Sequence, residues 1–400
     1  MSDLLAVTGA RIFDGQEWHD DSALLIELGY VSAIVRSSDL LDRSSDVSGR
    51  SSAVISRSEI VHIDGGVLVP GFIDLQVNGG GGVLFNNAPT LESIQTICSA
   101  HTQFGTTALL PTLITDTVEV NVAAIAAGKA ALDQRVPGFI GLHLEGPHLA
   151  LARKGTHDPA LIRPMDDADL ARLIAARAQL PNLICTVAAE TVTPQQISAL
   201  SSAGIIVSIG HSDASFETTK AAFDAGATMA THLFNAMSQL GNREPGVVGA
   251  VLSHDGVYAG LIADGIHVHP AAIELALRAK SQSDHIFLVT DAMSQTGTDI
   301  KTLELNGRTI TRSEGALRLA DGTLAGADLD MIDAVNFMQD RIGVSFEEAV
   351  RMASLYPAQA IGIESEFGHL QPGARASFVH LSDDRSVRAT WISGQQVYSA

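Results

Sequence analysis

The feature that most constrains the fold is a repeated pattern from about residue 69 onward, in which short apolar stretches alternate with longer, alanine-rich stretches of helical character. Parallel strands need a crossover helix between them, and a closed sheet of eight strands leaves no exposed edge. The pattern therefore predicts an α/β protein built on a (β/α)8 barrel of the TIM type. The predicted strands cover residues 71–77, 107–112, 139–145, 183–188, 205–210, 229–233, 258–263 and 286–290.

An open, doubly wound sheet is the main alternative, because it uses the same alternation of strands and helices. Its nucleotide-binding form carries a glycine-rich fingerprint of fixed spacing after the first strand. The four glycines at 79–82 follow the first strand here without that spacing. This difference favours the barrel.

Both ends of the chain show strand patterns separated by Gly and Asp turns. The predicted terminal strands are 4–13, 22–28, 30–35 and 59–68 at the start, and 376–381, 387–392 and 396–398 at the end. We predict that residues 1–68 and 369–400 form one small β-sandwich domain and that the barrel, residues 69–368, is inserted between its halves.

Three further segments lie outside these repeats. Residues 36–58 are dense in Ser, Asp and Arg, which predicts a solvated loop without an assigned function. Residues 302–305 and 307–319, separated by Asn306 and Gly307, are predicted to form a hairpin. Residues 346–361 are predicted to be helical.

The composition excludes several classes of protein. The chain has 45 acidic and 25 basic residues, a formal net charge of −20, whereas nucleic-acid binding normally depends on a basic surplus. Two cysteines cannot build a disulfide framework. The start of the chain lacks a basic leader, and every apolar stretch is interrupted before the ~18 residues of a membrane-spanning helix. We therefore expect a soluble, cytoplasmic protein that binds neither nucleic acid nor membrane.

Polar residues recur where the predicted barrel strands end, which is where barrel enzymes place their active sites. A single such histidine is more often a structural residue, but here six strands contribute. The residues concerned are Gln76, Asn78, His143, Glu145, His211, His232, Asn235, Asp264, His267 and Asp291.

Three of these residues could hold a metal ion. Glu145, His211 and His232 supply one carboxylate and two imidazoles from three strand ends, and a catalytic zinc site needs three such ligands. His143 could be a further ligand or could support one. Asp291 follows the last strand, where a carboxylate could take a proton from water and pass it to a leaving group.

The motifs of the chain resemble those of the N-acetylglucosamine-6-phosphate deacetylase branch of the amidohydrolase superfamily. The resemblance covers nearly the whole chain in order. The motifs are PGFIDLQVNGGGG at 70–82, GLHLEGPHL at 141–149, KGTH at 154–157, GHSDA at 210–214, THLFNAM at 231–237, REPG at 243–246, ADGIHV at 263–268, LVTDAM at 288–293 and SLYPAQAIG at 354–362. Asp213 and residues 290–297 depart from the commoner family pattern.

The resemblance implies roles for individual residues. It implies that Glu145, His211 and His232 bind the metal, that Asp291 is the general acid and base, and that His157 polarises the acetamide carbonyl. It also implies that a further set binds the amino-sugar phosphate. These implied substrate-binding residues are Gln76, Asn78, Thr156, His157, Asn235, Ala236, Arg243, Asp264, His267, Leu324, Ala325 and Gly326.

The first strand bears on the number of metals. Many amidohydrolases have a His-x-His pair there that holds a second metal, whereas this chain has Gln76 and Asn78. Amides are weaker ligands than imidazoles for divalent transition metals. We therefore predict one divalent metal per subunit, preferably zinc, although iron, cobalt or manganese suit the same ligands.

The resemblance implies a carbon–nitrogen hydrolase acting on a linear amide: N-acetyl-D-glucosamine 6-phosphate would give D-glucosamine 6-phosphate and acetate, in amino-sugar catabolism and cell-wall sugar recycling. It also implies a homodimer with Arg243 near the interface, where a forked guanidinium suits phosphate. The alternatives are a deacetylase for the galactosamine epimer, a cyclic-amide hydrolase and a non-catalytic sensor of amino-sugar phosphates. A cyclic-amide hydrolase typically carries the His pair that is missing here.

Overall fold

The computed structural model describes residues 4–42 and 60–400. Contacts between Cα atoms divide the chain into two compact units. One, the β unit, comprises Met1–Ile73, Thr102–Thr107 and Ser345–Ala400, and the other, the barrel unit, comprises Asp74–His101 and Ala108–Val344. The domain limits 1–68, 69–368 and 369–400 stay a prediction.

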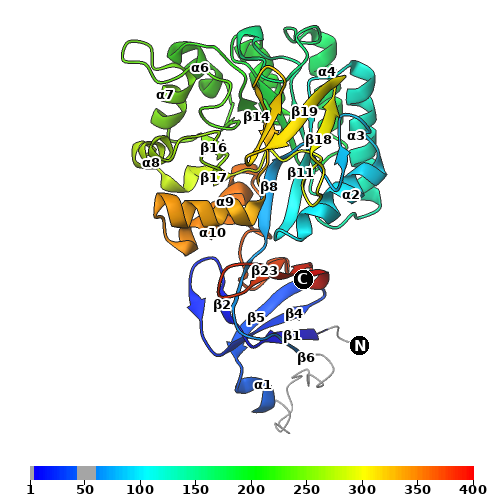
Figure 1. Ribbon diagram of the computed structural model, residues 1–400, viewed down its shortest axis with the longest axis vertical. Helices are drawn as coiled ribbons and strands as arrows, with labels where there is room; N and C mark the ends of the chain where they lie inside the picture. The colour runs from blue at the N-terminus through cyan, green and yellow to red at the C-terminus, as the bar shows by residue number, and fades with distance from the viewer. Residues whose placement is uncertain (1–3, 43–59) are drawn as a thin grey trace. The chain divides into compact units, whose positions relative to one another are not determined.

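The barrel is an eight-stranded sheet whose strands follow one another in chain order (Figure 1). Pairing from β11 to β17 is parallel throughout. The sheet closes on itself, because Val77 on the first strand bridges to Ala292 and the Asp291 amide donates to the Gln76 carbonyl at 2.9 Å. The predicted (β/α)8 barrel is therefore confirmed. The strands are β8 (Phe72–Val77), β11 (Thr106–Ile114), β12 (Leu142–Glu145), β13 (Leu183–Val187), β14 (Ile206–Ile209), β15 (Met229–Ala230), β16 (Tyr258–Leu261) and β17 (Ile286–Leu288).

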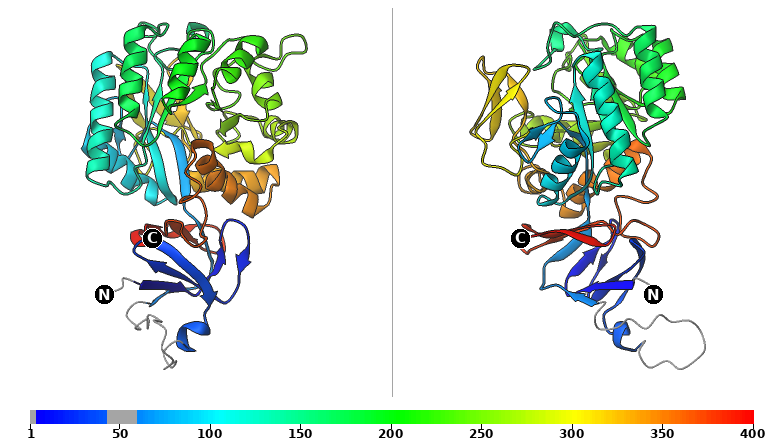
Figure 2. Two further views of the ribbon diagram at one scale, coloured as in Figure 1. Left: turned by 180° about the vertical axis from the view of Figure 1, so that it is seen from behind. Right: turned by 90° about the vertical axis from the view of Figure 1, so that its right-hand side faces the viewer.

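Helices cover the outer side of this sheet (Figure 2). Most begin at side chains that cap free backbone amides: Thr117 caps α3, and Asp166 and Thr193 form capping boxes on α4 and α5. The helices are α2 (Leu91–Thr102), α3 (Val118–Asp133), α4 (Asp167–Arg177), α5 (Pro194–Ser202), α6 (Phe216–Asp224), α7 (Gly246–Ser253), α8 (Pro270–Ala279) and α9 (Met331–Phe337). None of the helices in the described ranges has the length and apolar character needed to span a membrane.

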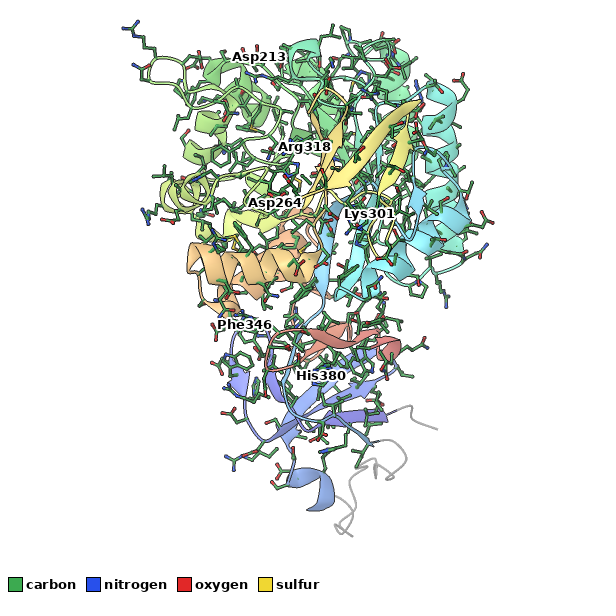
Figure 3. The ribbon with its side chains drawn as sticks, viewed as in Figure 1. Asp213, Asp264, Lys301, Arg318, Phe346 and His380 are labelled. Carbon is green, nitrogen blue, oxygen red and sulfur yellow. The ribbon has the colours of Figure 1, made fainter. Side chains whose placement is uncertain are left out.

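A four-stranded antiparallel sheet follows the last barrel strand. The predicted hairpin was too simple: the stretch 307–319 turns at Glu314 and Gly315, both with positive φ, and a fourth strand follows. One face packs on an apolar cluster with Leu84, Ile114 and Met293, whereas Lys301 and Arg318 are exposed (Figure 3). The strands are β18 (Thr302–Leu305), β19 (Arg308–Ser313), β20 (Ala316–Leu319) and β21 (Leu324–Ala327).

The β unit joins both chain ends. Two sheets, in the orders β5-β4-β1-β6 and β24-β23-β22-β7-β2-β3, share one apolar core that includes Val7, Phe378 and Trp391. Strand β22 pairs antiparallel with β7, which confirms a sandwich built from both termini. The strands are β1 (Leu4–Thr8), β2 (Arg11–Phe13), β3 (Trp18–His19), β4 (Ser22–Glu27), β5 (Tyr30–Arg36), β6 (Ile60–His62), β7 (Val67–Pro70), β22 (Phe378–Leu381), β23 (Val387–Ile392) and β24 (Gln395–Ser399).

Two predicted terminal strands are each two strands in the structure. The stretch 4–13 breaks at Gly9, where φ is +104° and a Cβ would lie 2.0 Å from the Ile63 carbonyl oxygen. The stretch 59–68 breaks at Gly65 and Gly66, which also have positive φ. The predicted helix 346–361 is found as α10 (Phe346–Ala353) and α11 (Leu355–Ile361). In the predicted loop 36–58, residues 39–42 form the short helix α1 (Asp39–Asp42), and 43–58 lie outside the described residues.

Candidate active site

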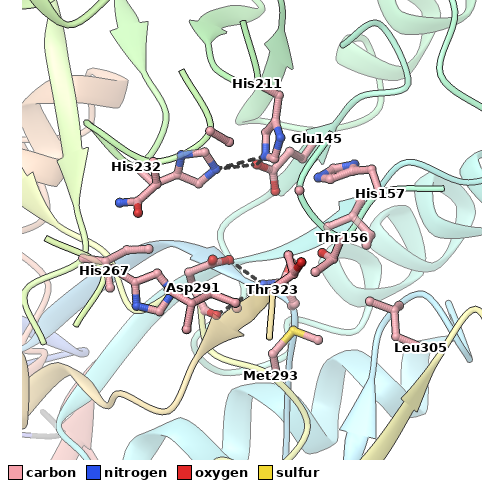
Figure 4. Close-up of a pocket in the computed structure, with 18 of the residues that line it drawn as sticks. Glu145, Thr156, His157, His211, His232, His267, Asp291, Met293, Leu305 and Thr323 are labelled. Carbon is pink, nitrogen blue, oxygen red and sulfur yellow. Dashed lines mark hydrogen bonds and ion pairs between the residues drawn. The ribbon is translucent and has the colours of Figure 1, made fainter. Parts of the chain in front are cut away.

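Glu145, His211 and His232 converge at one point, as the sequence predicted (Figure 4). Glu145 ends β12, and the histidines follow β14 and β15. His211 and His232 have φ of 48° and 33°, an unusual backbone for residues other than glycine, and this turns each residue out of its strand. The Nε2 atoms lie 3.1 Å from each other and 3.1 Å from Glu145 Oε1.

This donor set fits a divalent metal ion. Two imidazole nitrogens and one carboxylate oxygen face each other in a buried space, and they are the atom types that bind zinc and related metals. His211 Nδ1 donates to the Arg153 carbonyl at 2.7 Å, which leaves the Nε2 lone pair free for a metal. Burial raises the pKa of Glu145, but its contacts with the His211 and His232 imidazoles outweigh this and hold that pKa well below its usual range.

His143 is not part of this cluster. Its Nδ1 donates to the Leu75 carbonyl at 3.0 Å, and its Nε2 lies 2.6 Å from the Thr186 hydroxyl. Because both ring nitrogens already have partners, His143 links β12 to β8 and β13 and is not available as a metal ligand. Burial lowers the pKa of His143 to about 4, so the ring is neutral.

Asp291 lies beside the cluster and is held by the two amides that replace the His-x-His pair. Asn78 Nδ2 donates to Asp291 Oδ1 at 2.7 Å, and Gln76 Nε2 lies 3.2 Å from the same oxygen. Gln76 Nε2 also lies 3.4 Å from Glu145 Oε2. Burial raises the pKa of Asp291 to about 6, and the negative charge of Glu145 contributes. A carboxyl group with this pKa can both accept and return a proton near neutral pH.

His157 lies on the other side of the cluster, in the loop after β12. Its ring meets that of His211 edge-on, with 4.3 Å between the ring centroids. Thr115 contacts its Nδ1 through both the backbone amide, at 3.3 Å, and the hydroxyl, at 2.7 Å. Burial and the neighbouring His211 hold the pKa of His157 well below its usual range.

A cavity of about 350 Å³ opens over the cluster, Asp291 and His157 (Figure 4). Most of the residues predicted for substrate binding line it. They are Asn78, Thr156, His157, Asn235, Ala236, His267, Leu324 and Gly326.

Four predicted residues do not line the cavity. Gln76 lies behind Glu145 and Asp291, and Asp264 lies behind His267, whose Nδ1 is 2.6 Å from the Asp264 carboxylate. Ala325 is buried in the core beneath the four-stranded sheet. Arg243 is exposed in the loop before α7.

Several lining residues were missed by the sequence analysis. Arg153 precedes the KGTH motif, and its basic side chain was a possible signal. The apolar residues of the wall look like any other core residues in the sequence. The missed lining residues are Leu84, Asn86, Ile114, Ala152, Arg153, Gly155, Ile262, Met293, Leu305 and Thr323.

Asp74 was also missed as a supporting residue. It is fully buried on β8. Its carboxylate contacts the Thr290 hydroxyl and accepts a hydrogen bond from the backbone N–H of Gln76 at 3.2 Å. It thereby joins the first strand to the residue before Asp291. Burial raises the pKa of Asp74 to about 7. Its position within an apolar run was the available signal.

Comparison with known proteins defines the class. A profile of the amidohydrolase family matches residues 67–397. The chain belongs to this family.

Amino-sugar phosphate deacetylases are among the proteins that the chain is similar to. The N-acetylgalactosamine-6-phosphate deacetylase of Shewanella sp. (strain ANA-3) is 46% identical over 335 residues, 84% of each chain. The N-acetylglucosamine-6-phosphate deacetylase of Haemophilus influenzae is 36% identical over 84% of this chain and 87% of its own. The crystal structure of N-acetylglucosamine-6-phosphate deacetylase from Pasteurella multocida has a TM-score of 0.91 and 33% identity, covering 99% of this chain and 100% of its own.

Proposed function

We propose that the protein hydrolyses the acetamide of N-acetyl-D-glucosamine 6-phosphate, giving D-glucosamine 6-phosphate and acetate. The observation that carries this proposal is the convergence of a metal-ligand cluster, a carboxyl group of near-neutral pKa and a buried neutral imidazole on one cavity. These are the groups that amide hydrolysis needs: a means of activating water, a proton carrier and a donor to the carbonyl oxygen.

The residues divide the reaction between them. A divalent metal held by Glu145, His211 and His232 would lower the pKa of water and polarise the amide carbonyl. The Asp291 carboxylate accepts a proton from the attacking water as the new C–O bond forms. It then returns that proton to the nitrogen as the C–N bond breaks, which gives the amine and acetic acid, and the acid loses its remaining proton to water to become acetate. His157 donates a hydrogen bond to the carbonyl oxygen as negative charge develops there.

The substrate-binding assignments belong to the same proposal. Asn235, Ala236 and His267, with Thr156, Leu324 and Gly326, surround the space where the sugar and phosphate are proposed to bind. Gln76, Asn78 and Asp264 support them by orienting Asp291, Glu145 and His267. We propose one metal, preferably zinc, because amides occupy the positions of the histidine pair.

The placement of Arg243 leads to a proposed homodimer. Its side chain is exposed and does not line the cavity of its own chain. A role in binding phosphate therefore requires that it reach the cavity of a second copy, near the subunit interface. We also propose a cytoplasmic enzyme of amino-sugar catabolism and cell-wall sugar recycling, to which such a substrate belongs.

The galactosamine epimer is a second candidate substrate. The relative with 46% identity is named for it, whereas the Haemophilus relative at 36% is named for the glucosamine form. Measuring acetate release from both 6-phosphates, with zinc supplied, decides between them. The preferred substrate is the one with the higher kcat/KM.

Replacing the proton carrier tests whether the protein is an enzyme at all. Asp291→Asn should bind substrate but lose turnover by at least about 10²-fold. Asp133→Asn, an exposed aspartate paired with Lys129, is the matched control and should retain activity. Near-normal turnover of Asp291→Asn would refute the assigned role, and binding without any acetate release by the parent protein would indicate a sensor.

A further inference from the structure

We propose that Thr115 is a positioning residue that fixes His157 in the tautomer carrying its proton on Nε2, so that this nitrogen donates to the substrate carbonyl oxygen. The inference rests on the proposed function and adds to it a residue that no motif indicated. It depends on the two contacts that Thr115 makes with the ring.

The contacts determine where the ring proton lies. The Thr115 backbone N–H, 3.3 Å from His157 Nδ1, can only donate, so Nδ1 must be the acceptor. The Thr115 hydroxyl lies 2.7 Å from the same nitrogen, whereas its other possible acceptor, the Glu145 carbonyl, is 3.5 Å away. The hydroxyl therefore also donates to Nδ1. A neutral histidine whose Nδ1 accepts carries its hydrogen on Nε2.

The surroundings hold Thr115 in this position. It follows β11 and is 1% exposed, and His157 is 2% exposed, so bulk water does not compete for the contact. The neighbouring Gly146 leaves room for the hydroxyl: a Cβ there would lie 2.2 Å from Thr115 Oγ1. Gly146 directly follows the ligand Glu145, so the chain that presents the ligand also makes space for the threonine hydroxyl.

The neighbouring histidine shows the consequence of the opposite arrangement. His211 Nδ1 donates to a backbone carbonyl, so its Nε2 has a lone pair and faces the metal-ligand cluster. His157 is close enough for its ring to contact that of His211, but its Nδ1 accepts. Its Nε2 consequently carries hydrogen and cannot ligate a metal. Thr115 thus gives His157 the proton arrangement of a hydrogen-bond donor, whereas the adjacent His211 has that of a metal ligand.

The tautomer can be measured directly in the full-length protein labelled with ¹⁵N-histidine. The His157 resonances are identified by their loss in His157→Asn. In the metal-free parent protein without substrate we expect Nε2 to be protonated and Nδ1 not, and the same in Thr115→Ser, which keeps the hydroxyl. A His157 protonated on Nδ1 in the parent would overturn the inference.

Kinetics provide the second arm. Thr115→Val keeps the shape but removes the hydroxyl, and it should lower kcat about 10-fold or more with little change in KM, since loss of a whole oxyanion donor costs about 10²–10³-fold. Thr115→Ser should restore kcat to within a few-fold of the parent. Equal kcat values for the valine and serine variants would refute the role. If the parent releases no acetate from either epimer, the proposed function fails, while the tautomer measurement still decides the inference.

Discussion

The contact between Asn78 and Asp291 allows a quantitative prediction about the pH dependence of the reaction. Asn78 Nδ2 lies 2.7 Å from the carboxylate oxygen, a short hydrogen bond to a charged group. Such bonds stabilise the charged form by about 1.5–3 kcal/mol. A tenfold change in proton affinity corresponds to about 1.4 kcal/mol, so removing the bond in Asn78→Ala should raise the pKa of Asp291 by roughly one to two. The lower figure is expected because Gln76 still contacts the same oxygen.

The sign follows from the role of Asp291. The residue must be ionised to accept a proton from water, so activity is lost as pH falls through its pKa. Raising that pKa moves the acid limb of the kcat/KM profile to higher pH. Asn78→Ala should therefore lose most activity below about pH 7 and approach the parent as pH rises.

The assay is acetate release between pH 5 and 9 with zinc supplied to both proteins. The phosphate of the substrate titrates near pH 6, but it is common to both profiles and cancels in their comparison. Asn235→Ala is the matched control, because this cavity-lining amide donates to the Leu233 carbonyl and not to Asp291. It should change KM and leave the acid limb in place. An Asn78→Ala profile that is lower at every pH but not displaced would refute the reasoning.

Three further predictions concern metal and stability. Chelation should abolish acetate release and lower the melting temperature, and zinc should restore both, since an ion at 100 times its Kd adds about 2.7 kcal/mol. Burial and Asp333 raise the pKa of Asp330 to about 7, above its unfolded value, so the stability of the parent falls as pH rises from about 4 to about 7. Asp330→Asn retains the helix cap and should be about 2–4 kcal/mol more stable than the parent at pH 8 but equal at pH 4, measured by denaturant unfolding. Phe378→Ala removes a buried ring stacked on Trp391 and should destabilise the β unit by about 3–5 kcal/mol, whereas a loss below 1 kcal/mol would contradict the described core.

The barrel and the metal-ligand set could be predicted because their signals are local. Each strand is a short apolar run, and strand ends in a closed parallel sheet meet at one edge. Glu145, His211 and His232 therefore had to lie close together once the strands were assigned. The errors at 4–13, 59–68 and 307–319 arose where residues with positive φ interrupt a continuous strand pattern.

The supporting contacts could not be predicted, because they depend on side-chain directions. Thr115 and Asp74 lie in or beside apolar strands, and the sequence does not show that one contacts His157 and the other Thr290. His143 illustrates the same limit. Its spacing from Glu145 allows it to be a ligand or a supporting residue, and only the contacts of both its nitrogens distinguish the two.

The charge of the cavity links the substrate to the proposed dimer. The chain carries a net charge of −20, yet the proposed substrate is itself an anion. Among the described lining residues, Arg153 is the one guanidinium, and its Nε is paired with Asp213 at 2.8 Å. The His267 ring also lines the cavity, and its Nδ1 contacts the Asp264 carboxylate. The residues described as lining the cavity therefore offer a phosphate no Lys or Arg side chain free of a carboxylate partner, and an exposed arginine such as Arg243 of a second copy would meet that need.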